Sequence, residues 1–292
     1  MKQIYWILFL SLAFGGKIKI ISSTTDLADI AKSIGGNRVT VTSIARGNQD
    51  PHYVEVLPSY MVKVKRADIY LKVGLELDLW AQQIIDGSRN RNIQVVDCSQ
   101  NILAKEKPTG KVNASMGDIH RFGNPHYWLD PENGKVIAAA IRDVLIARDP
   151  SAASTYRANY TSFATAIDSL LEQLVTDYAS LSGKKIIFFH NSWPYFADRF
   201  GLRTVAFIEP LPGIPPSPGH LDKIINIITS DSIYCLALES YFNTDAVDFI
   251  SRKTGVPYIK LSQSVGALDG VDSYFDLFRY NLHTLREVNH DQ

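Results

Sequence analysis

The sequence predicts an α/β protein of two lobes, each a parallel sheet flanked by helices, joined by one long rigid helix. Short apolar segments that resemble strands alternate with amphipathic segments that resemble helices, a pattern typical of parallel sheets covered by helices. One uninterrupted helical segment then separates an early set of such segments from a late one. We therefore expect a leader at residues 1–16, an N-terminal lobe at 17–149, a connecting helix at 150–183 and a C-terminal lobe at 184–292.

The N-terminal lobe is expected to begin with a strand and to alternate from there. Its strand-like segments are apolar and short, and they read KIKIISSTT, VTVTSIA, IYLKVG and IQVVDCS. The helix-like segments between them carry apolar residues at three- and four-residue steps, and they read DLADIAKSIGG, PSYMVKVKRAD and LDLWAQQIIDGSR. A further helix should begin at Pro131, with Asp130 as its N-cap, because these residue types suit those two positions.

The connecting helix has no glycine or proline between its expected ends at Pro150 and Gly183. Proline suits a first helical turn and glycine suits a helix end. At 1.5 Å per residue, roughly 30 residues would extend about 45 Å, which suits a rigid strut between lobes. The apolar side chains recur every three or four residues, as in one amphipathic helix: Tyr156, Tyr160, Phe163, Ile167, Leu170, Leu171, Leu174 and Tyr178.

The alternation resumes in the C-terminal lobe. The expected strands read KKIIFFH, RTVAFIE, SIYCLALES and PYIKLS. The expected helices read WPYFADRFG, PSPGHLDKIINIITSD, TDAVDFISRKTG and SYFDLFRYNLHTLREV. Open α/β sheets bind ligands beyond the carboxyl ends of their strands, so a site is expected there.

The first residues resemble a secretory leader. Lys2 precedes an apolar run at residues 4–14, and Ala13 and Gly15 suit the −3 and −1 positions of a cleavage site. The run is too short to cross a bilayer as a helix. No cysteine follows it directly. We therefore expect a soluble periplasmic chain, released by cleavage near Lys17 and without a lipid anchor.

The composition excludes some classes of partner but does not decide whether the two cysteines form a disulfide. Thirty basic residues balance thirty acidic ones, so the chain lacks the broad positive surface that nucleic acid or anionic lipid attracts. We expect no nucleic-acid partner, and a monomer. Cys98 and Cys235 lie in strand-like segments without the spacing of metal ligands. We interpret them as structural, either as one disulfide or as two buried thiols.

Three histidines lie in loops or at the end of a strand. His52 and His126 belong to the N-terminal lobe, each directly after a proline (Pro51 and Pro125), whereas His190 ends a strand of the C-terminal lobe. Imidazole is the usual ligand for zinc and neighbouring first-row metals. Each histidine alone is more simply an ordinary packed residue. Their joint placement indicates a metal site contributed by both lobes.

The motifs around these histidines resemble the zinc and manganese receptor family of ABC importers. SSTTDLADIAKSIGGNRVTVTSIARGNQDPHYVEVLPS resembles the opening of that family, and NPHYWLDP, FFHNSWPYFADRFGL and PGIPPSPGHL resemble its later motifs in the same order. The resemblance covers essentially the whole mature chain. It implies two α/β lobes joined by a long helix, and a receptor that is no enzyme. Such a receptor carries a metal ion in the cleft between its lobes to an ABC permease of the inner membrane.

The resemblance also implies a ligand set. His52, His126 and His190 correspond to metal ligands, and members with histidine at the third position tend to favour zinc, whereas those with glutamate favour manganese. Zn²⁺ is therefore the expected transported ion and Mn²⁺ the alternative. Many members supply an aspartate where this chain has Gln263. The fourth ligand is left open between Gln263, a water and Glu239.

Two other functions are compatible with three histidines, a zinc hydrolase and a metal-binding adhesin. A zinc hydrolase also keeps an open coordination position, but no H-E-x-x-H motif is present. Glu209 and Glu239 could reach a cleft, although we favour helix capping or hydrogen bonds between lobes for both. A metal-binding adhesin is a third possibility.

His120 is the single histidine of a loop that is rich in histidine in many zinc receptors, so we interpret it as a surface residue, with an auxiliary metal contact as the alternative.

The expected behaviour follows from the ligands and from the connecting helix. Imidazoles bind metal only when neutral, so affinity should fall below about pH 6.5. The long helix should limit hinge motion. Release is therefore expected to involve local loop movement when the receptor docks.

Overall fold

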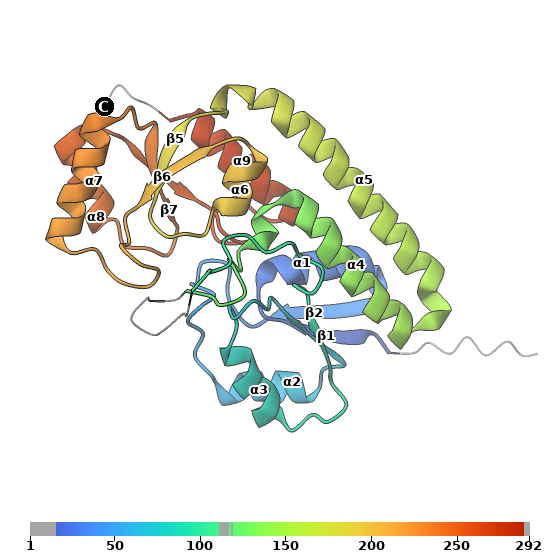
Figure 1. Cartoon of the computed structure of the whole chain (residues 1–292). Helices are drawn as coiled ribbons and strands as arrows, with labels where there is room; N and C mark the ends of the chain where they lie inside the picture. The colour runs from blue at the N-terminus through green and yellow to red at the C-terminus, as the bar shows by residue number, and fades with distance from the viewer. Residues whose placement is uncertain (1–15, 111–116, 118, 289–292) are drawn as a thin grey trace, which may run out of the picture.

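The computed structural model describes residues 16–110, 117 and 119–288 (Figure 1). The expected leader, residues 1–16, lies outside the described residues except for Gly16. The described residues form two four-stranded sheets flanked by helices, and the long helix α5 (Ala153–Asp177) runs alongside both lobes. The predicted fold class is confirmed.

The N-terminal lobe contains a parallel sheet of order β2-β1-β3-β4. All the strands and helices expected in it are present. Its strands are β1 (Ile18–Ser22), β2 (Val39–Ser43), β3 (Ile69–Lys72) and β4 (Gln94–Asp97). Its first helices are α1 (Thr25–Gly35), α2 (Pro58–Lys65) and α3 (Trp80–Ser88). Helices α2 and α3 cover one face of the sheet, and α1 and the later helix α4 (Pro131–Arg148) cover the other (Figure 1).

The C-terminal lobe repeats this topology with a parallel sheet of order β6-β5-β7-β8. The equivalent order means that each lobe places its first strand inside the sheet. The strands are β5 (Lys185–Phe188), β6 (Arg203–Phe207), β7 (Cys235–Glu239) and β8 (Tyr258–Leu261). The helices are α6 (Pro194–Arg199), α7 (Pro218–Ser230), α8 (Asp245–Thr254) and α9 (Tyr274–Arg286).

Two long helices, α4 and α5, connect the two sheets along the chain. Helix α4 (Pro131–Arg148) begins as predicted, because the Asp130 side chain accepts a hydrogen bond from the Glu132 backbone N–H at 3.0 Å and proline takes the first position. Helix α5 is shorter than expected. Single 3₁₀ turns at Pro150–Ala152 and Ala179–Leu181 flank it, so its α-helical part extends about 38 Å.

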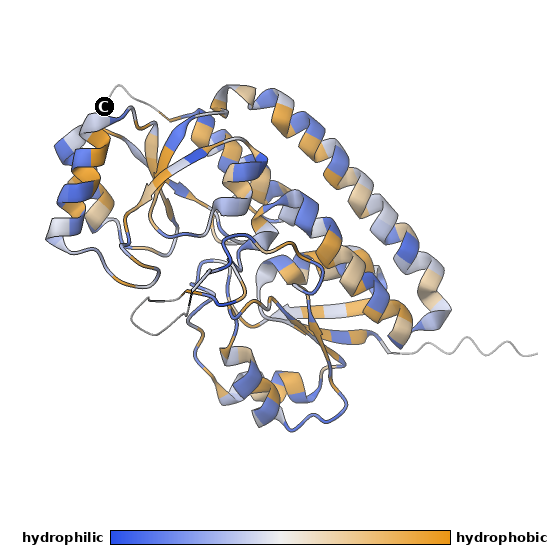
Figure 2. Ribbon diagram, in the orientation of Figure 1, coloured by the Kyte–Doolittle hydropathy of each residue, from blue (hydrophilic) through white to orange (hydrophobic). Residues whose placement is uncertain are grey.

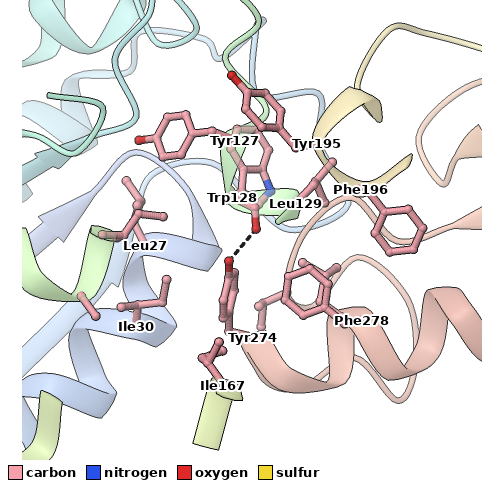
Figure 3. Packing of buried hydrophobic residues seen from close by; sticks show 14 of the residues in the cluster. Leu27, Ile30, Tyr127, Trp128, Leu129, Ile167, Tyr195, Phe196, Tyr274 and Phe278 are labelled. Atoms are coloured by element: carbon pink, nitrogen blue, oxygen red, sulfur yellow. Dashed lines mark hydrogen bonds between the residues drawn. The ribbon is translucent and has the colours of Figure 1, made fainter. Parts of the chain in front are cut away.

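The hydrophobic core is continuous from one lobe to the other. Apolar residues of β1, α1 and α4 belong to the same buried cluster as residues of α5, β5, α6 and α9. At its centre, the Tyr274 hydroxyl donates to the Trp128 carbonyl oxygen at 2.6 Å, among Leu27 and Ile30 of α1 and Phe278 of α9 (Figure 3). In Figure 2, hydrophobic residues are frequent on the strands of the N-terminal sheet, and they alternate with hydrophilic residues along α5. The two lobes are therefore packed as one body.

Both cysteines are buried free thiols in different lobes. Cys98 directly follows β4 and Cys235 begins β7. The sequence allows either one disulfide or two buried thiols, and the structure shows two buried thiols. No helix within the described ranges is both long enough and apolar enough to cross a membrane.

Candidate metal centre

The structure brings His52, His126 and His190 together, with one possible ligand atom from each within 4.8 Å of the others. The ring centroids lie 5.2 Å apart for His52 and His126, 5.3 Å for His52 and His190, and 5.6 Å for His126 and His190. His52 comes from the loop between β2 and α2, His126 from the turn before α4, and His190 from the residues directly after β5. Both lobes therefore contribute to one cluster.

The His52 ring is oriented by a tight local turn. The Asp50 Oδ1 atom accepts hydrogen bonds from the His52 backbone N–H at 2.9 Å and from its ring Nδ1 at 2.8 Å. Pro51 lies between them and fixes its own φ angle. Because Nδ1 donates to a carboxylate, the lone pair of the neutral ring is on Nε2. That nitrogen is the one available to a metal.

The same turn recurs at His126. Here the Asn124 Oδ1 atom accepts from the His126 backbone N–H at 3.0 Å and from its ring Nδ1 at 3.0 Å, across Pro125. The Asn124 amide nitrogen donates to Glu106 Oε2 at 3.1 Å and to the Asn191 carbonyl oxygen at 2.8 Å, which fixes the orientation of the amide. The ring Nδ1 must therefore be the donor, and Nε2 carries the lone pair.

The buried Nε2 atom of His126 is the clearest sign of a missing ligand. His126 is 1% exposed, and Nε2 has no hydrogen-bond partner within the described part of the chain. Buried polar atoms in native proteins nearly always have a partner. A metal ion bound among the three rings would supply one.

His190 is oriented by a carboxylate that is distant in sequence. Its Nδ1 atom lies 2.7 Å from Glu209 Oε2, which also accepts from the Gly213 backbone N–H at 3.2 Å. Both side chains are almost fully buried. We had expected Glu209 to cap a helix or to bond across the lobes, and it does neither in these contacts, since it holds the ring of a residue in its own lobe.

The electrostatic environment differs between the rings. Burial, followed by the charges of His52 and His190, holds the pKa of His126 well below its ordinary value. Burial also lowers the pKa of His190, but the hydrogen bond to Glu209 and the charges of Glu239 and Glu209 outweigh it and raise that pKa. His126 is therefore neutral and ready to bind a cation, whereas His190 holds its proton more firmly until a metal displaces it.

Gln263 lies in the loop after β8 and is 1% exposed. Its Oε1 atom accepts a hydrogen bond from the Tyr241 hydroxyl at 2.7 Å, and its Nε2 atom donates to Ser192 Oγ at 3.1 Å. Its backbone carbonyl oxygen accepts from Trp128 Nε1 at 2.9 Å. Both the oxygen and the nitrogen of the side-chain amide thus already have hydrogen-bond partners.

Glu239, the other protein candidate for a fourth ligand, is fully buried at the end of β7. Its Oε1 atom accepts from Trp193 Nε1 at 2.9 Å, a contact within the C-terminal lobe rather than the helix cap or inter-lobe bond favoured above. Burial raises the pKa of Glu239 to about 7. Among the described residues, the group of close metal-ligand atoms contains the three histidines and no carboxylate.

His120 lies in a loop and is partly exposed, and its ring contacts the three-histidine cluster. Its Nε2 atom lies 3.3 Å from the Nε2 atom of His52, and the two rings stack with their centroids 5.3 Å apart and their planes at 23°. Burial, followed by the charges of His52 and His190, lowers the pKa of His120 to about 3. A fourth neutral imidazole therefore borders the three-histidine cluster.

Two pockets open onto the cluster. One, of about 400 Å³, is bordered by His52, His190 and Glu209. The other, of about 350 Å³, is bordered by His120, His126 and His190. The cluster therefore lies between the two pockets rather than in a sealed core.

The sequence reasoning missed the residues that orient the rings. Asp50 and Asn124 could have been found, because an aspartate or asparagine two residues before the histidine, with proline between, occurs at both positions. Such short side chains readily accept hydrogen bonds from the backbone two residues on. Glu209 gave no comparable local signal.

Comparisons with known proteins agree with this arrangement. The model of the family described as ZnuA, zinc-uptake complex component A, periplasmic, matches residues 20–288. The manganese-binding lipoprotein MntA of Halalkalibacterium halodurans is 26% identical over 275 residues, which cover 92% of this chain and 88% of MntA. The manganese ABC transporter substrate-binding lipoprotein PsaA of Streptococcus pneumoniae is 24% identical, over 93% of this chain and 88% of PsaA.

Solved structures show the same fold. A crystal structure of ZnuA has a TM-score of 0.80 and 25% identity, and the match covers 92% of this chain and 98% of that one. A mutant of the laminin-binding adhesin Lmb from Streptococcus agalactiae has a TM-score of 0.79 and 22% identity over the same shares, which shows the common fold alone. Since the family model spans nearly all of the described chain, the protein belongs to the ZnuA family, within the substrate-binding proteins of metal ABC transporters.

Proposed function

We propose that this chain is a monomeric periplasmic receptor that captures Zn²⁺ between its lobes and delivers it to an ABC permease of the inner membrane. The observation that carries the proposal is the convergence of His52, His126 and His190, with no carboxylate in their group among the described residues. Imidazole nitrogens suit zinc, whereas manganese prefers carboxylate and carbonyl oxygens. The donor set therefore favours zinc.

The orientation of the rings supports the same proposal. Asp50, Asn124 and Glu209 each hold the Nδ1 atom of one ring. Outer hydrogen bonds of this kind fix the tautomer of a ligating histidine and increase its basicity. The three rings are thus held in place before any ion arrives, and a metal bound at His190 displaces a proton from that ring.

Manganese is the alternative cargo. The relatives MntA and PsaA are named for manganese, whereas the matching family model is named for zinc. In this chain the two carboxylates next to the cluster, Asp50 and Glu209, are bonded to ring nitrogens. A manganese site would need these or other oxygens to turn toward the ion.

The deciding experiment is a metal competition on the purified mature chain, residues 17–292. We expect one tightly bound equivalent of zinc by mass spectrometry, retained in excess Mn²⁺, and lost in His126→Ala. His283→Ala is the matched control, because the His283 side chain is 60% exposed on α9. Displacement of zinc by excess manganese would favour a manganese receptor, and a wild type without tight metal would sink the proposal.

The family consists of transporter binding proteins rather than enzymes, and we infer that this chain performs no catalysis. A zinc hydrolase needs a base beside the metal-bound water. The Asp50 and Glu209 carboxylates are engaged with ring nitrogens, and Glu239 lies outside the group of close ligand atoms among the described residues. Ester or peptide hydrolysis by the zinc-loaded chain that disappears in His126→Ala would contradict this. Binding to immobilised laminin provides the corresponding test of an adhesin.

The periplasmic location rests on the leader expected at residues 1–16. Expression of the full chain in a Gram-negative host should yield a periplasmic product whose N-terminus lies at or next to Lys17. Intact-mass measurement of that product tests the proposal. An uncleaved chain retained with the cells' cytoplasmic fraction would contradict export.

A further inference from the structure

We propose that His120 is the fourth ligand of the bound metal ion, so that four imidazoles, from His52, His120, His126 and His190, surround it. This inference rests on the proposed function and specifies the site further. It replaces Gln263, the fourth ligand suggested by resemblance, with a residue from the loop before α4.

The separation of two nitrogens carries the argument. The Nε2 atoms of His120 and His52 lie 3.3 Å apart. Two nitrogens bound to one tetrahedral zinc, at bond lengths of about 2.0–2.1 Å, lie about 3.3 Å from each other. This separation fits neighbouring ligands on one ion as well as a hydrogen bond between the rings. His120 lies outside the group whose ligand atoms are all within 4.8 Å of one another, so its ring would move toward His126 and His190 on binding the ion.

The surroundings of His120 hold it at this place. The next residue, Arg121, donates from its backbone N–H to Glu76 Oε2 at 2.8 Å, and from its side-chain Nε to Glu76 Oε1 at 2.8 Å. This ion pair fastens the loop to the N-terminal lobe directly beside the histidine. His120 also borders the pocket that His126 and His190 share.

The competing protein ligands are less available. If the Gln263 side chain turned toward the ion, the Tyr241 hydroxyl and Ser192 would lose their hydrogen bonds to its amide. A turn of Glu239 that moved Oε1 would leave Trp193 without its acceptor, whereas the Oε2 atom has no hydrogen-bond partner among the described residues and makes Glu239 the main rival of His120. Leaving buried polar groups without partners is unfavourable. His120 already faces a ligand nitrogen and requires no such exchange.

Four imidazoles also suit the charges near the site. The ligands are neutral, so the ion keeps its double charge, which the Asp50 and Glu209 carboxylates behind two of the rings offset. A set of nitrogen ligands without oxygen disfavours manganese. His120 would therefore increase the preference for zinc over manganese.

The test is X-ray absorption on the zinc-loaded mature chain, which counts imidazole ligands through their multiple-scattering signal. We expect four imidazoles in the wild type, three in His120→Ala and four in Gln263→Ala. Zinc affinity, measured by competition with a chromophoric chelator, should fall at least about tenfold in His120→Ala, because even the partners of ligands contribute that much. His120→Asn is a second variant, and circular dichroism checks that each variant is folded.

The outcomes separate this inference from the proposed function. One bound zinc with three imidazoles in the wild type would overturn the role of His120 and leave the receptor proposal standing. An unchanged zinc spectrum in His120→Ala would overturn it as well, as would a loss of a ligand in Gln263→Ala. A wild type that binds no zinc would overturn both proposals.

Discussion

Asp50 and Asn124 perform the same task with different chemistry. Each accepts two hydrogen bonds from the histidine two residues later, one from the backbone and one from the ring. Asp50 adds a negative charge behind its ring. Asn124 instead uses its amide nitrogen to hold the Asn191 carbonyl, next to His190 on the other lobe. One side chain therefore positions ligands from both lobes.

Replacing Asp50 separates the effect of orientation from that of charge. In Asp50→Ala the His52 ring loses its acceptor, and we expect zinc affinity to fall about 10–100-fold. Asp50→Asn keeps an oxygen at the same position, so its loss should be smaller. Chelator competition measures both variants. Equal losses would show that the charge, rather than the held ring, sets the affinity.

At this scale the sequence predicted the clustered histidines better than the residues that orient their rings. His52, His126 and His190 could be found because imidazole itself is distinctive and two of them follow proline. Glu209 could not, since its contact with His190 depends on how β6 and β5 align. The contact of His120 with His52 could not be predicted either, because a single histidine in a long loop gives no sign of where the chain returns. Only the folded loop places it against His52.

At the level of elements, α4 and α9 meet where a glycine is required. A Cβ atom added at Gly134 would lie 2.5 Å from the ring of Tyr274, which is fully buried. The Tyr274 hydroxyl also bonds the Trp128 carbonyl, so the ring cannot move aside without losing that bond. The absence of a side chain at Gly134 lets the C-terminal lobe approach the helix that follows His126.

Alanine at this glycine should destabilise the protein. In an open helix the change usually stabilises by about 0.5–1 kcal/mol, but overpacking a core costs about 1–3 kcal/mol, so the net change in Gly134→Ala is a loss. Gly219→Ala in α7 is the matched control, because nothing lies within 4 Å of its added Cβ. Urea unfolding of both variants gives the comparison. A gain in stability for Gly134→Ala would contradict the close packing.

The order and type of the elements could be predicted because each lobe alternates apolar strands with amphipathic helices of ordinary length. The ends of α5 could not. The sequence from Pro150 to Gly183 lacks any breaker, yet the first and last turns tighten to 3₁₀ geometry. Such turns are common at helix ends and depend on local packing more than on composition.

Across the whole molecule, a buried carboxyl links the lobes. Asp26 of α1 accepts a hydrogen bond from the Val265 backbone N–H at 3.0 Å, in the loop that follows β8. Burial raises the pKa of Asp26 to about 7, although the Val265 hydrogen bond lowers it in part. The folded protein therefore holds a proton on Asp26 that the unfolded chain releases at lower pH.

This makes the stability depend on pH. Because the folded pKa lies above the unfolded one, Asp26 stabilises most below about pH 4, and that contribution declines as pH rises toward about 7, by a few kcal/mol at most. Asp26→Asn keeps an acceptor for Val265 without the charge. Its free energy of unfolding should match the wild type at about pH 3.5, below the unfolded pKa, and exceed it at about pH 8. A difference that is the same at both values would contradict the raised pKa.

The continuous core also limits motion of the lobes. Helix α5 packs against α1, α4 and α9, and the same cluster of buried residues extends into both sheets. We expect the radius of gyration from small-angle scattering to change by less than about 1 Å between the apo and zinc-loaded states. Metal exchange then occurs through the loops that carry His52 and His120. A large rotation of one lobe between the two states would refute this.

The two buried thiols have a consequence for where the protein can work. Burial raises the pKa of both Cys98 and Cys235, so little reactive thiolate forms on either. Among the described residues, the candidate metal centre is built from imidazoles and includes neither cysteine. Outside the cytoplasm no glutathione pool repairs oxidised cysteine. We expect the proposed zinc receptor to keep its cargo and its fold in the presence of peroxide, under conditions in which a zinc site made of thiolates would be oxidised and emptied.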